Sequence, residues 1–147
     1  MSHDLRIERL IDGTPDEVFD AFVDPDAMHE WYRDNPGWNV EVRSCDVRVG
    51  GTTIVAFGPD DKRYVEEMTY SEVARPSRLV YAERFVNPDG SAFDTLITLT
   101  LEAQNGKTLL TIVQTGFPDA GERDAHQGGW PGFIDRLERV VAARRVV

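Results

Sequence analysis

Residues 126–145 of the chain, HQGGWPGFIDRLERVVAARR, decide which fold this sequence predicts. Apolar and charged side chains recur there with the period of an amphipathic helix, which we expect to run from about Asp119 to Arg145. One face of this helix carries Trp130, Phe133, Ile134, Leu137, Val140 and Val141, and the other carries Asp135, Arg136, Glu138 and Arg139. We therefore expect Trp130, Phe133 and Leu137 to face the rest of the protein. Arg136 and Arg139 should face water.

The predicted helix has an unusual beginning, because Gly128, Gly129, Trp130, Pro131 and Gly132 follow one another. Glycine and proline both disfavour a helix interior. We expect this segment to be a loose entry to the helix that can move to admit a ligand. The helix would then form one wall of an internal pocket.

Upstream of the helix, six segments alternate apolar and polar residues with the period of two that is typical of half-buried strands. Turn sequences such as GG, GPDD, ARPS, NPDG and QNG separate them. These turns predict a six-stranded antiparallel meander. Its predicted strands are Asn39–Val49, Thr52–Gly58, Arg63–Val73, Arg78–Phe85, Phe93–Ala103 and Thr108–Thr115.

The segment before the meander predicts one further strand and two short helices. Strand periodicity covers Asp4–Asp12. Thr14 and Glu17 then form a capping box for a first helix, and Asp24 caps a second. The first helix has an apolar stripe of Val18, Phe19, Phe22 and Val23, and the end of the second carries Met28, Trp31 and Tyr32.

This order of elements, a strand, two short helices, six strands and a long helix, predicts an α+β fold in two layers. The sheet of about seven strands must curl around the C-terminal helix, because both have an apolar face to bury. A curved sheet that grips one helix leaves an interior between the two layers. Whether side chains fill that interior depends on the strand registers, which periodicity alone does not define.

Four motifs in this order resemble the heat-shock-protein-ninety ATPase activator homologue family (AHSA-like), within the START-like superfamily that is also called SRPBCC. TPDEVFDAFVDPDAMHEWY (14–32) resembles the opening helices of the family, and DVRVGG (46–51) its turn into the third strand. SEVARPSRLVYAERF (71–85) resembles its central hairpin, and HQGGWPGFIDRLERVV (126–141) its closing helix. The resemblance implies a helix-grip fold over one domain, residues 1–147. It also implies a cavity between the sheet and the C-terminal helix, which the superfamily uses for lipids, sterols, polyketides and other apolar molecules.

The composition argues against several classes of partner. The 147 residues carry a formal net charge of -10, and the resulting negative field repels nucleic-acid phosphates and anionic membrane surfaces. The single cysteine, Cys45, cannot form an internal disulfide, and no apolar run is long enough for a signal sequence or a membrane span. We therefore expect a cytoplasmic protein that binds no nucleic acid and does not insert into a membrane. The oligomeric state stays open.

No sequence motif points to a catalytic nucleophile, a metal or a cofactor. Cys45 lies in a strand pattern without a nucleophile elbow, which favours a packed strand residue over a catalytic thiol. His3, in a frayed terminus, His29 and His126 lack the paired spacing of metal ligands such as HExxH. We expect no metal and no cofactor, and a binding protein rather than an enzyme. A cyclase-like activity on a bound apolar substrate stays open.

The segment YVEEMTYSE, residues 64–72, places acidic side chains in a predicted strand. Glu66 and Glu72 share one face with Met68 and Tyr70, and Glu67 lies on the other face. A carboxyl group in an apolar cavity would favour its protonated form, and could act as a general acid or base or hold the polar end of a ligand. Unpaired acids are rarely buried, so the favoured interpretation is that this strand bulges or that these glutamates lie at its solvated ends.

The inward-facing apolar and aromatic residues define the candidate ligand site: Trp31, Phe57, Met68, Tyr81, Phe85, Trp130, Phe133 and Leu137. We expect Trp31, Phe57 and Trp130 at the pocket entrance. This surface predicts binding of a small apolar or aromatic molecule, lipid-like or polyketide-like, that is uncharged or weakly polar. The alternative is a protein-interaction module, because the resemblance implies a co-chaperone that contacts a heat-shock ATPase through the outer surface of the sheet.

Overall fold

The computed structural model describes residues 3–145, so the predicted domain of residues 1–147 extends two residues further at each end. The described chain contains seven strands and three helices. It begins with β1 (His3–Ile11), α1 (Pro15–Val23) and α2 (Pro25–Trp31). The elements that follow are β2 (Asn39–Cys45), β3 (Thr52–Gly58), β4 (Tyr64–Ala74), β5 (Arg78–Val86), β6 (Ala92–Gln104), β7 (Lys107–Phe117) and the long helix α3 (Ala120–Arg145).

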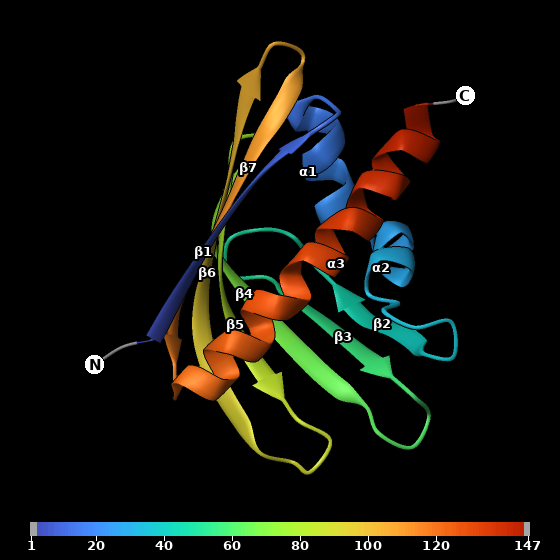
Figure 1. Ribbon diagram of the computed structural model, residues 1–147, viewed down its shortest axis with the longest axis vertical. Helices are drawn as coiled ribbons and strands as arrows, with labels where there is room; N and C mark the ends of the chain where they lie inside the picture. Colours follow the sequence, from blue (N-terminus) through green and yellow to red (C-terminus); the bar gives the residue numbers. More distant parts are fainter. Residues whose placement is uncertain (1–2, 146–147) are drawn as a thin grey trace.

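The strands form one antiparallel sheet in the order β1-β7-β6-β5-β4-β3-β2. β2 to β7 follow one another as the predicted meander, and β1 occupies the edge beside β7. The sheet curves around α3, and α1 and α2 pack beside the C-terminal half of that helix (Figure 1). The predicted α+β helix-grip fold is confirmed.

The two short helices begin where their capping residues predict. The Thr14 hydroxyl accepts a hydrogen bond from the Glu17 amide at 3.2 Å, and the Glu17 carboxylate accepts one from the Thr14 amide at 2.9 Å. Asp24 accepts a hydrogen bond from the Asp26 amide at 2.9 Å and caps α2. Because Asp24 ends α1 and starts α2, the two helices follow each other directly and place the buried Trp31 at the end of α2.

β2 ends at Cys45, before the predicted strand end at Val49. The chain turns there in a tight loop, in which Gly50 has φ 82, a left-handed conformation that glycine adopts without strain. A Cβ atom at Gly51 would lie 2.2 Å from the Asp46 carbonyl oxygen. The last residues of the predicted strand therefore form a loop, although they alternate like a strand.

α3 begins at Ala120, so its predicted extent is confirmed, but the expectation of a loose entry at residues 128–133 is wrong. Those residues lie inside the helix, and the Asp119 side chain caps the true start by accepting a hydrogen bond from the Glu122 amide at 2.8 Å. The helix tolerates its glycines and its proline because Trp130 is buried among them and packs the segment against the sheet. No helix within residues 3–145, α3 included, is long and apolar enough to cross a membrane.

The face of α3 that packs on the sheet is the predicted one. Arg139 is exposed as expected, but the expectation is wrong for Arg136, whose side chain is only 14% exposed. The end of α2 packs over it, so Arg136 Nε donates to the Trp31 carbonyl oxygen at 2.9 Å and Nη1 donates to Asp34 at 3.1 Å. A cation is favourable at the C-terminal end of a helix. The buried residues of the packed face are Trp130, Ile134, Leu137, Val140 and Val141, and Phe133 is half-buried.

Candidate functional site

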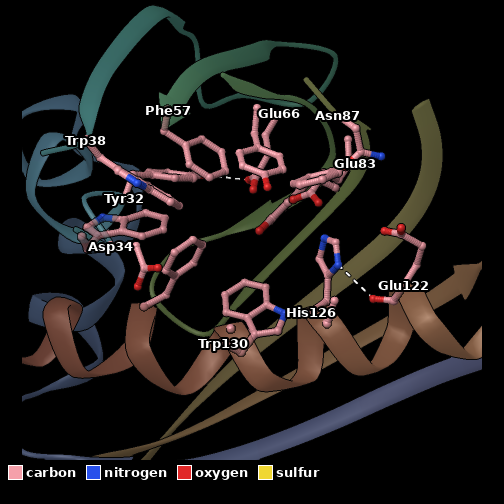
Figure 2. A pocket seen from close by; sticks show the side chains of 17 residues that line it. Tyr32, Asp34, Trp38, Phe57, Glu66, Glu83, Asn87, Glu122, His126 and Trp130 are labelled. Atoms are coloured by element: carbon pink, nitrogen blue, oxygen red, sulfur yellow. Dashed lines mark hydrogen bonds between the residues drawn. The ribbon is translucent and has the colours of Figure 1, made fainter. Parts of the chain in front are cut away.

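A cavity of about 360 Å³ lies between the sheet and the N-terminal half of α3 (Figure 2). Three residues of its lining, Asp34, Ala125 and Gly129, are exposed to solvent. Trp31, Phe57 and Trp130, which were predicted at the entrance, are buried and form inner walls instead. The complete lining is Trp31, Tyr32, Asp34, Trp38, Phe57, Tyr64, Glu66, Tyr81, Glu83, Phe85, Asn87, Glu122, Ala125, His126, Gly129, Trp130 and Phe133.

Most of the predicted ligand residues line this cavity. Met68 does not, because it is buried behind Tyr32, whose hydroxyl lies 3.8 Å from the Met68 sulfur. Leu137 does not either, because it lies further along α3, toward the half of the helix beside α1 and α2. Contact of any of these residues with a ligand stays a prediction. The predicted residues that do line the cavity are Trp31, Phe57, Tyr81, Phe85, Trp130 and Phe133.

Aromatic rings make up much of the cavity wall and hold one another in place. Trp31 stacks on Tyr32 with ring centroids 4.3 Å apart, and Phe57 stacks on Tyr64 at 5.6 Å. Phe133 approaches from α3 and lies 5.5 Å from Tyr32. The cavity therefore presents large apolar faces from both the sheet and the helices, which suits an apolar or aromatic body.

Hydrogen bonds fix two of the tryptophan rings in the wall. Trp31 Nε1 donates to the carbonyl oxygen of Ala21 in α1 at 3.0 Å. Trp130 Nε1 donates to Gln114 Oε1 in β7 at 2.9 Å, and Gln114 Nε2 donates in turn to Thr95 Oγ1 in β6 at 2.9 Å. Both indole N–H groups are thus already bonded, so these two rings offer a ligand their apolar faces.

Two carboxyl groups are buried in the wall formed by β4 and β5. Glu66 is 6% exposed and Glu83 is 3% exposed, and the two side chains lie close together in Figure 2. The Tyr32 hydroxyl donates to Glu66 Oε1 at 2.8 Å, and the Glu83 side chain lies beside that of Glu66. Two neighbouring carboxylates repel each other when both are ionised in an apolar wall, so one of the two groups retains a proton. We call Glu66 and Glu83 together the acid pair.

Burial raises the pKa of both members of the acid pair. Removal from water raises the pKa of Glu66 from 4.5 to about 7, although hydrogen bonds from Tyr32 and Glu83 act to lower it. Removal from water also raises the pKa of Glu83 well above 4.5, and the charge of Glu66 adds to that rise. Near neutral pH the acid pair therefore holds at least one proton and can exchange it with a ligand.

The burial of Glu66 corrects the interpretation favoured from the sequence, in which the glutamates of this segment lie at solvated strand ends. Glu66 is the third residue of β4 and faces the cavity, and its pairing partner on β5 is the buried Phe85. Glu67 points to the outer face and is half-buried. Glu72 lies beyond a register shift in β4, and its carboxylate forms an ion pair with Arg78 Nε at 2.9 Å.

Glu83 is the main residue that the sequence reasoning missed. It lies between Tyr81 and Phe85, and both of these neighbours were predicted to face inward. Because alternate residues of a strand share a face, the same periodicity places Glu83 inside with them. The signal was present in the sequence and was outweighed by the rarity of buried acids.

His126 extends from α3 toward the cavity, on the side opposite the acid pair (Figure 2). Its Nδ1 lies 3.1 Å from the carbonyl oxygen of Glu122, which can only accept a hydrogen bond, so Nδ1 carries the ring proton. Burial lowers the pKa of His126. The ring is therefore neutral at neutral pH, and its Nε2 atom is a hydrogen-bond acceptor.

The remaining candidate residues lie away from the cavity lining. His3 is part of β1 rather than a frayed terminus, and His29 lies on α2. The Cys45 thiol donates to the Val23 carbonyl oxygen at 3.4 Å, and burial raises its pKa, which disfavours a reactive thiolate. Within residues 3–145, no group of three or more His, Cys, Asp or Glu side chains is arranged to hold a metal ion.

Comparison with known proteins assigns the chain to a family. The sequence model of the family described as Activator of Hsp90 ATPase homolog 1-like protein matches residues 12–142. The chain belongs to this family. The resemblance to the Hsp90 ATPase activator family in the sequence motifs is therefore confirmed.

Solved structures share the fold of this Hsp90 activator-like chain. A protein of Chromobacterium violaceum is 29% identical with a TM-score of 0.81, and the match covers 94% of this chain and 96% of that one. A protein of Rhizobium loti is 24% identical with a TM-score of 0.80, over 95% and 96% of the two chains. An AHSA1-like protein of Aeromonas hydrophila is 23% identical with a TM-score of 0.77, over 99% and 96%. The last two, at under 25% identity, support the fold alone. No curated protein matches the chain.

Proposed function

We propose that this protein binds a small apolar or aromatic molecule, lipid-like or polyketide-like, in the cavity between the sheet and α3. The observation that carries this proposal is the cavity itself, about 360 Å³ in volume and lined largely by aromatic residues. Small-molecule sites commonly have volumes of roughly 300 to 1,000 Å³ and apolar walls with a few polar groups. The START-like fold supports the same function, but a fold hosts many activities, so the site carries the argument.

The tryptophans provide a direct test of ligand binding. All three tryptophans of the chain, Trp31, Trp38 and Trp130, line the cavity. Intrinsic fluorescence therefore reports on the site and on little else. We expect an uncharged aromatic probe such as 4-phenylbutan-1-ol to change the fluorescence saturably and to raise the Tm as its concentration rises.

Phe133→Ala is a suitable variant for the same test. The Phe133 ring contacts Trp31 and Phe57 edge-on in the cavity and is only half-buried, so the fold depends less on it than on the fully buried rings. Removing the ring should weaken binding of the probe by roughly 1 to 3 kcal/mol. Leu96→Ala, on the exposed outer face of β6, is the matched control and should bind like the wild type. Equal affinity in the two variants would count against this cavity as the site.

A second candidate function is a co-chaperone that contacts a heat-shock ATPase. Membership of the Hsp90 activator-like family is the observation that favours it. The test is the ATPase rate of an Hsp90 with and without this protein. Stimulation of that rate, together with no response of the tryptophan fluorescence to any apolar probe, would place the co-chaperone function ahead of ligand binding.

The remaining parts of the proposal concern location, turnover and partners. A free Cys45 and a net charge of -10 support a cytoplasmic protein that does not bind nucleic acid. We propose binding without turnover and without a metal or cofactor. Recovery of a chemically altered probe after incubation with the protein would overturn the absence of turnover and favour a cyclase-like enzyme.

A further inference from the structure

The charged residues that line the cavity are all acids. Four lining residues are Asp or Glu, and none of the described lining residues is Lys or Arg. Asp34 is exposed and Glu122 is partly exposed, whereas Glu66 and Glu83 are buried. Asp34 is paired with Arg136 at 3.1 Å, so the repulsion of an anionic ligand comes mainly from Glu122, Glu66 and Glu83 when they are ionised.

Two further polar atoms of the cavity are available to a ligand. Tyr81 is 5% exposed and lines the cavity, and its hydroxyl has no hydrogen-bond partner among the described residues. Within residues 3–145, Arg136 Nη2 is the one side-chain nitrogen or oxygen that is fully buried without a hydrogen-bond partner. The Tyr81 hydroxyl also lacks a partner but is not fully buried, so it faces the open space of the cavity. The second atom is His126 Nε2. Both can accept a hydrogen bond from a ligand.

Aromatic faces surround the same space. Phe85 lies opposite Glu66 in the pairing of β4 and β5, and Tyr64 lies 5.5 Å from Phe85. A ring face attracts a cation that lies within about 6 Å of the ring centroid. Aromatic faces, carboxyl groups and free acceptors together are the combination of groups that binds alkylammonium ions.

We propose that the cavity selects ligands that carry a protonated amine on an aromatic or apolar body, with the amine against Glu66 and Glu83 and within reach of the Tyr81 hydroxyl. This inference rests on the proposed function and narrows its ligand class. It replaces the uncharged or weakly polar ligand expected from the sequence. That expectation rested on apolar and aromatic inward positions, to which the structure adds the buried Glu66 and Glu83.

The acid pair explains why a positive charge on the ligand matters. Two ionised carboxylates in contact within an apolar wall repel each other, so the pair keeps a proton. An ammonium group supplies the positive charge in place of that proton and can donate to both carboxylates. Binding of an amine should therefore release about one proton, whereas binding of an alcohol should release none.

The pH dependence of amine binding follows from the titratable groups that line the cavity with the acid pair. These are Tyr32 at the C-cap of α2, Tyr64 from β4, Tyr81 from β5, Glu122 and His126 from α3, and Asp34. Burial raises the pKa of Tyr32 and of Tyr81 above 10, so both stay neutral. Protonation of the acid pair and of His126 at low pH both act against a cation. Amine affinity should therefore rise from about pH 5 to about pH 8.

Three probes with the same body test the inference: 4-phenylbutylamine, 4-phenylbutan-1-ol and 4-phenylbutyrate. Each is titrated into the protein at neutral pH, with tryptophan fluorescence for affinity and calorimetry in two buffers of different ionisation enthalpy for proton release. We expect the amine to bind at least about tenfold more tightly than the alcohol, and the carboxylate to bind most weakly. An amine no tighter than the alcohol overturns the inference and leaves the proposed function standing. Failure of all three probes counts against both.

Variants connect the selectivity to the acid pair. In Glu66→Gln/Glu83→Gln, the ratio of amine affinity to alcohol affinity should fall to near one, and proton release should disappear. Glu67→Gln, one residue away on the outer face of β4, is the matched control and should keep the wild-type ratio. A wild-type ratio in the double variant would overturn the inference. If that variant does not fold, the pH dependence of amine binding to the wild type decides, and a flat profile overturns it.

Discussion

Glu66 and Glu83 make the stability of the folded protein depend on pH. Both carboxyl groups have a higher pKa in the folded protein than in the unfolded chain, where 4.5 is the ordinary value. The stability linked to such groups is complete below the unfolded pKa and is lost as the pH rises through the folded pKa, about 7 for Glu66. At 1.36 kcal/mol per pKa unit, the loss through Glu66 is on the order of 3 kcal/mol.

The first prediction is that Glu66→Gln/Glu83→Gln flattens this dependence. We compare the unfolding free energy of the double variant with that of the wild type at each pH. The difference should favour the double variant more above neutral pH than near pH 4, because an amide never ionises. Urea unfolding at several pH values measures the free energy. Glu67→Gln should follow the wild-type curve. A constant difference between wild type and double variant at all pH values would show that the pair is not buried as described.

The second prediction concerns Tyr32, which donates to Glu66 and so lowers its pKa. Tyr32→Phe should raise the pKa of Glu66 further and destabilise the protein by about 1 kcal/mol. Carbon NMR titration of the glutamate carboxyl groups measures the pKa. Tyr70→Phe is the control, because the Tyr70 hydroxyl donates to Thr53 at 2.7 Å and not to the acid pair. A similar shift in both variants would contradict the role of Tyr32.

At the scale of single residues, the sequence predicts the face of a strand on which a side chain lies better than it predicts the side chains that it contacts. Strand alternation placed Tyr81 and Phe85 inside, and it extends to Glu83. The contact between Glu66 and Glu83 depends on the register of β4 on β5. The Tyr32 hydroxyl reaches Glu66 only because α2 packs over the end of the sheet. Neither of these arrangements is encoded in local periodicity.

Among the elements, α3 determines the shape of the site, because its N-terminal half faces the cavity and its C-terminal half packs beside α1 and α2. The bonds from Trp130 to Gln114 and from Gln114 to Thr95 tie the middle of this helix to the sheet. Periodicity predicted the extent of α3 to within one residue at each end. It failed for the glycine-rich segment, because local propensity is weak against the packing of one buried tryptophan.

The third prediction tests whether that segment is rigid helix. A Cβ atom added at Gly128 would meet no atom within 4 Å. Gly128 is exposed to solvent and lies well inside the length of α3, away from both of its ends. Gly128→Ala should therefore stabilise the protein by roughly 0.5 to 1 kcal/mol and leave probe affinity unchanged. Urea unfolding and fluorescence titration measure the two effects. Weaker or slower probe binding in the more stable variant would revive the mobile entry expected from the sequence.

At the scale of the whole molecule, the α+β helix-grip fold was predictable because each connection between consecutive strands from β3 to β7 coincides with a turn sequence. The cavity was expected in general terms, but its volume and opening depend on side-chain packing across layers that no local pattern specifies. The chain has a net charge of -10, and the charged residues inside the site are acidic as well. Charge counted over the whole sequence does not reveal where the acids gather.

The fourth prediction is that the chain unfolds as one unit, because one sheet gripping one helix shares a single hydrophobic core. Tryptophan fluorescence and far-UV circular dichroism should report the same urea midpoint. The fluorescence probes lie around the cavity, whereas circular dichroism averages over all helices and strands. Two separated midpoints would contradict the single domain predicted for residues 1–147.

The central claim is that the cavity between the sheet and α3 binds a small molecule, and the indole signals of the tryptophans test it most directly. Nitrogen–proton NMR spectra of the labelled protein should be recorded with increasing 4-phenylbutylamine and 4-phenylbutan-1-ol. The account predicts saturable shifts of the indole N–H signals of Trp31, Trp38 and Trp130, with the amine saturating at the lower concentration. Indole signals that do not move with either probe, or shifts confined to the outer face of the sheet, would contradict it.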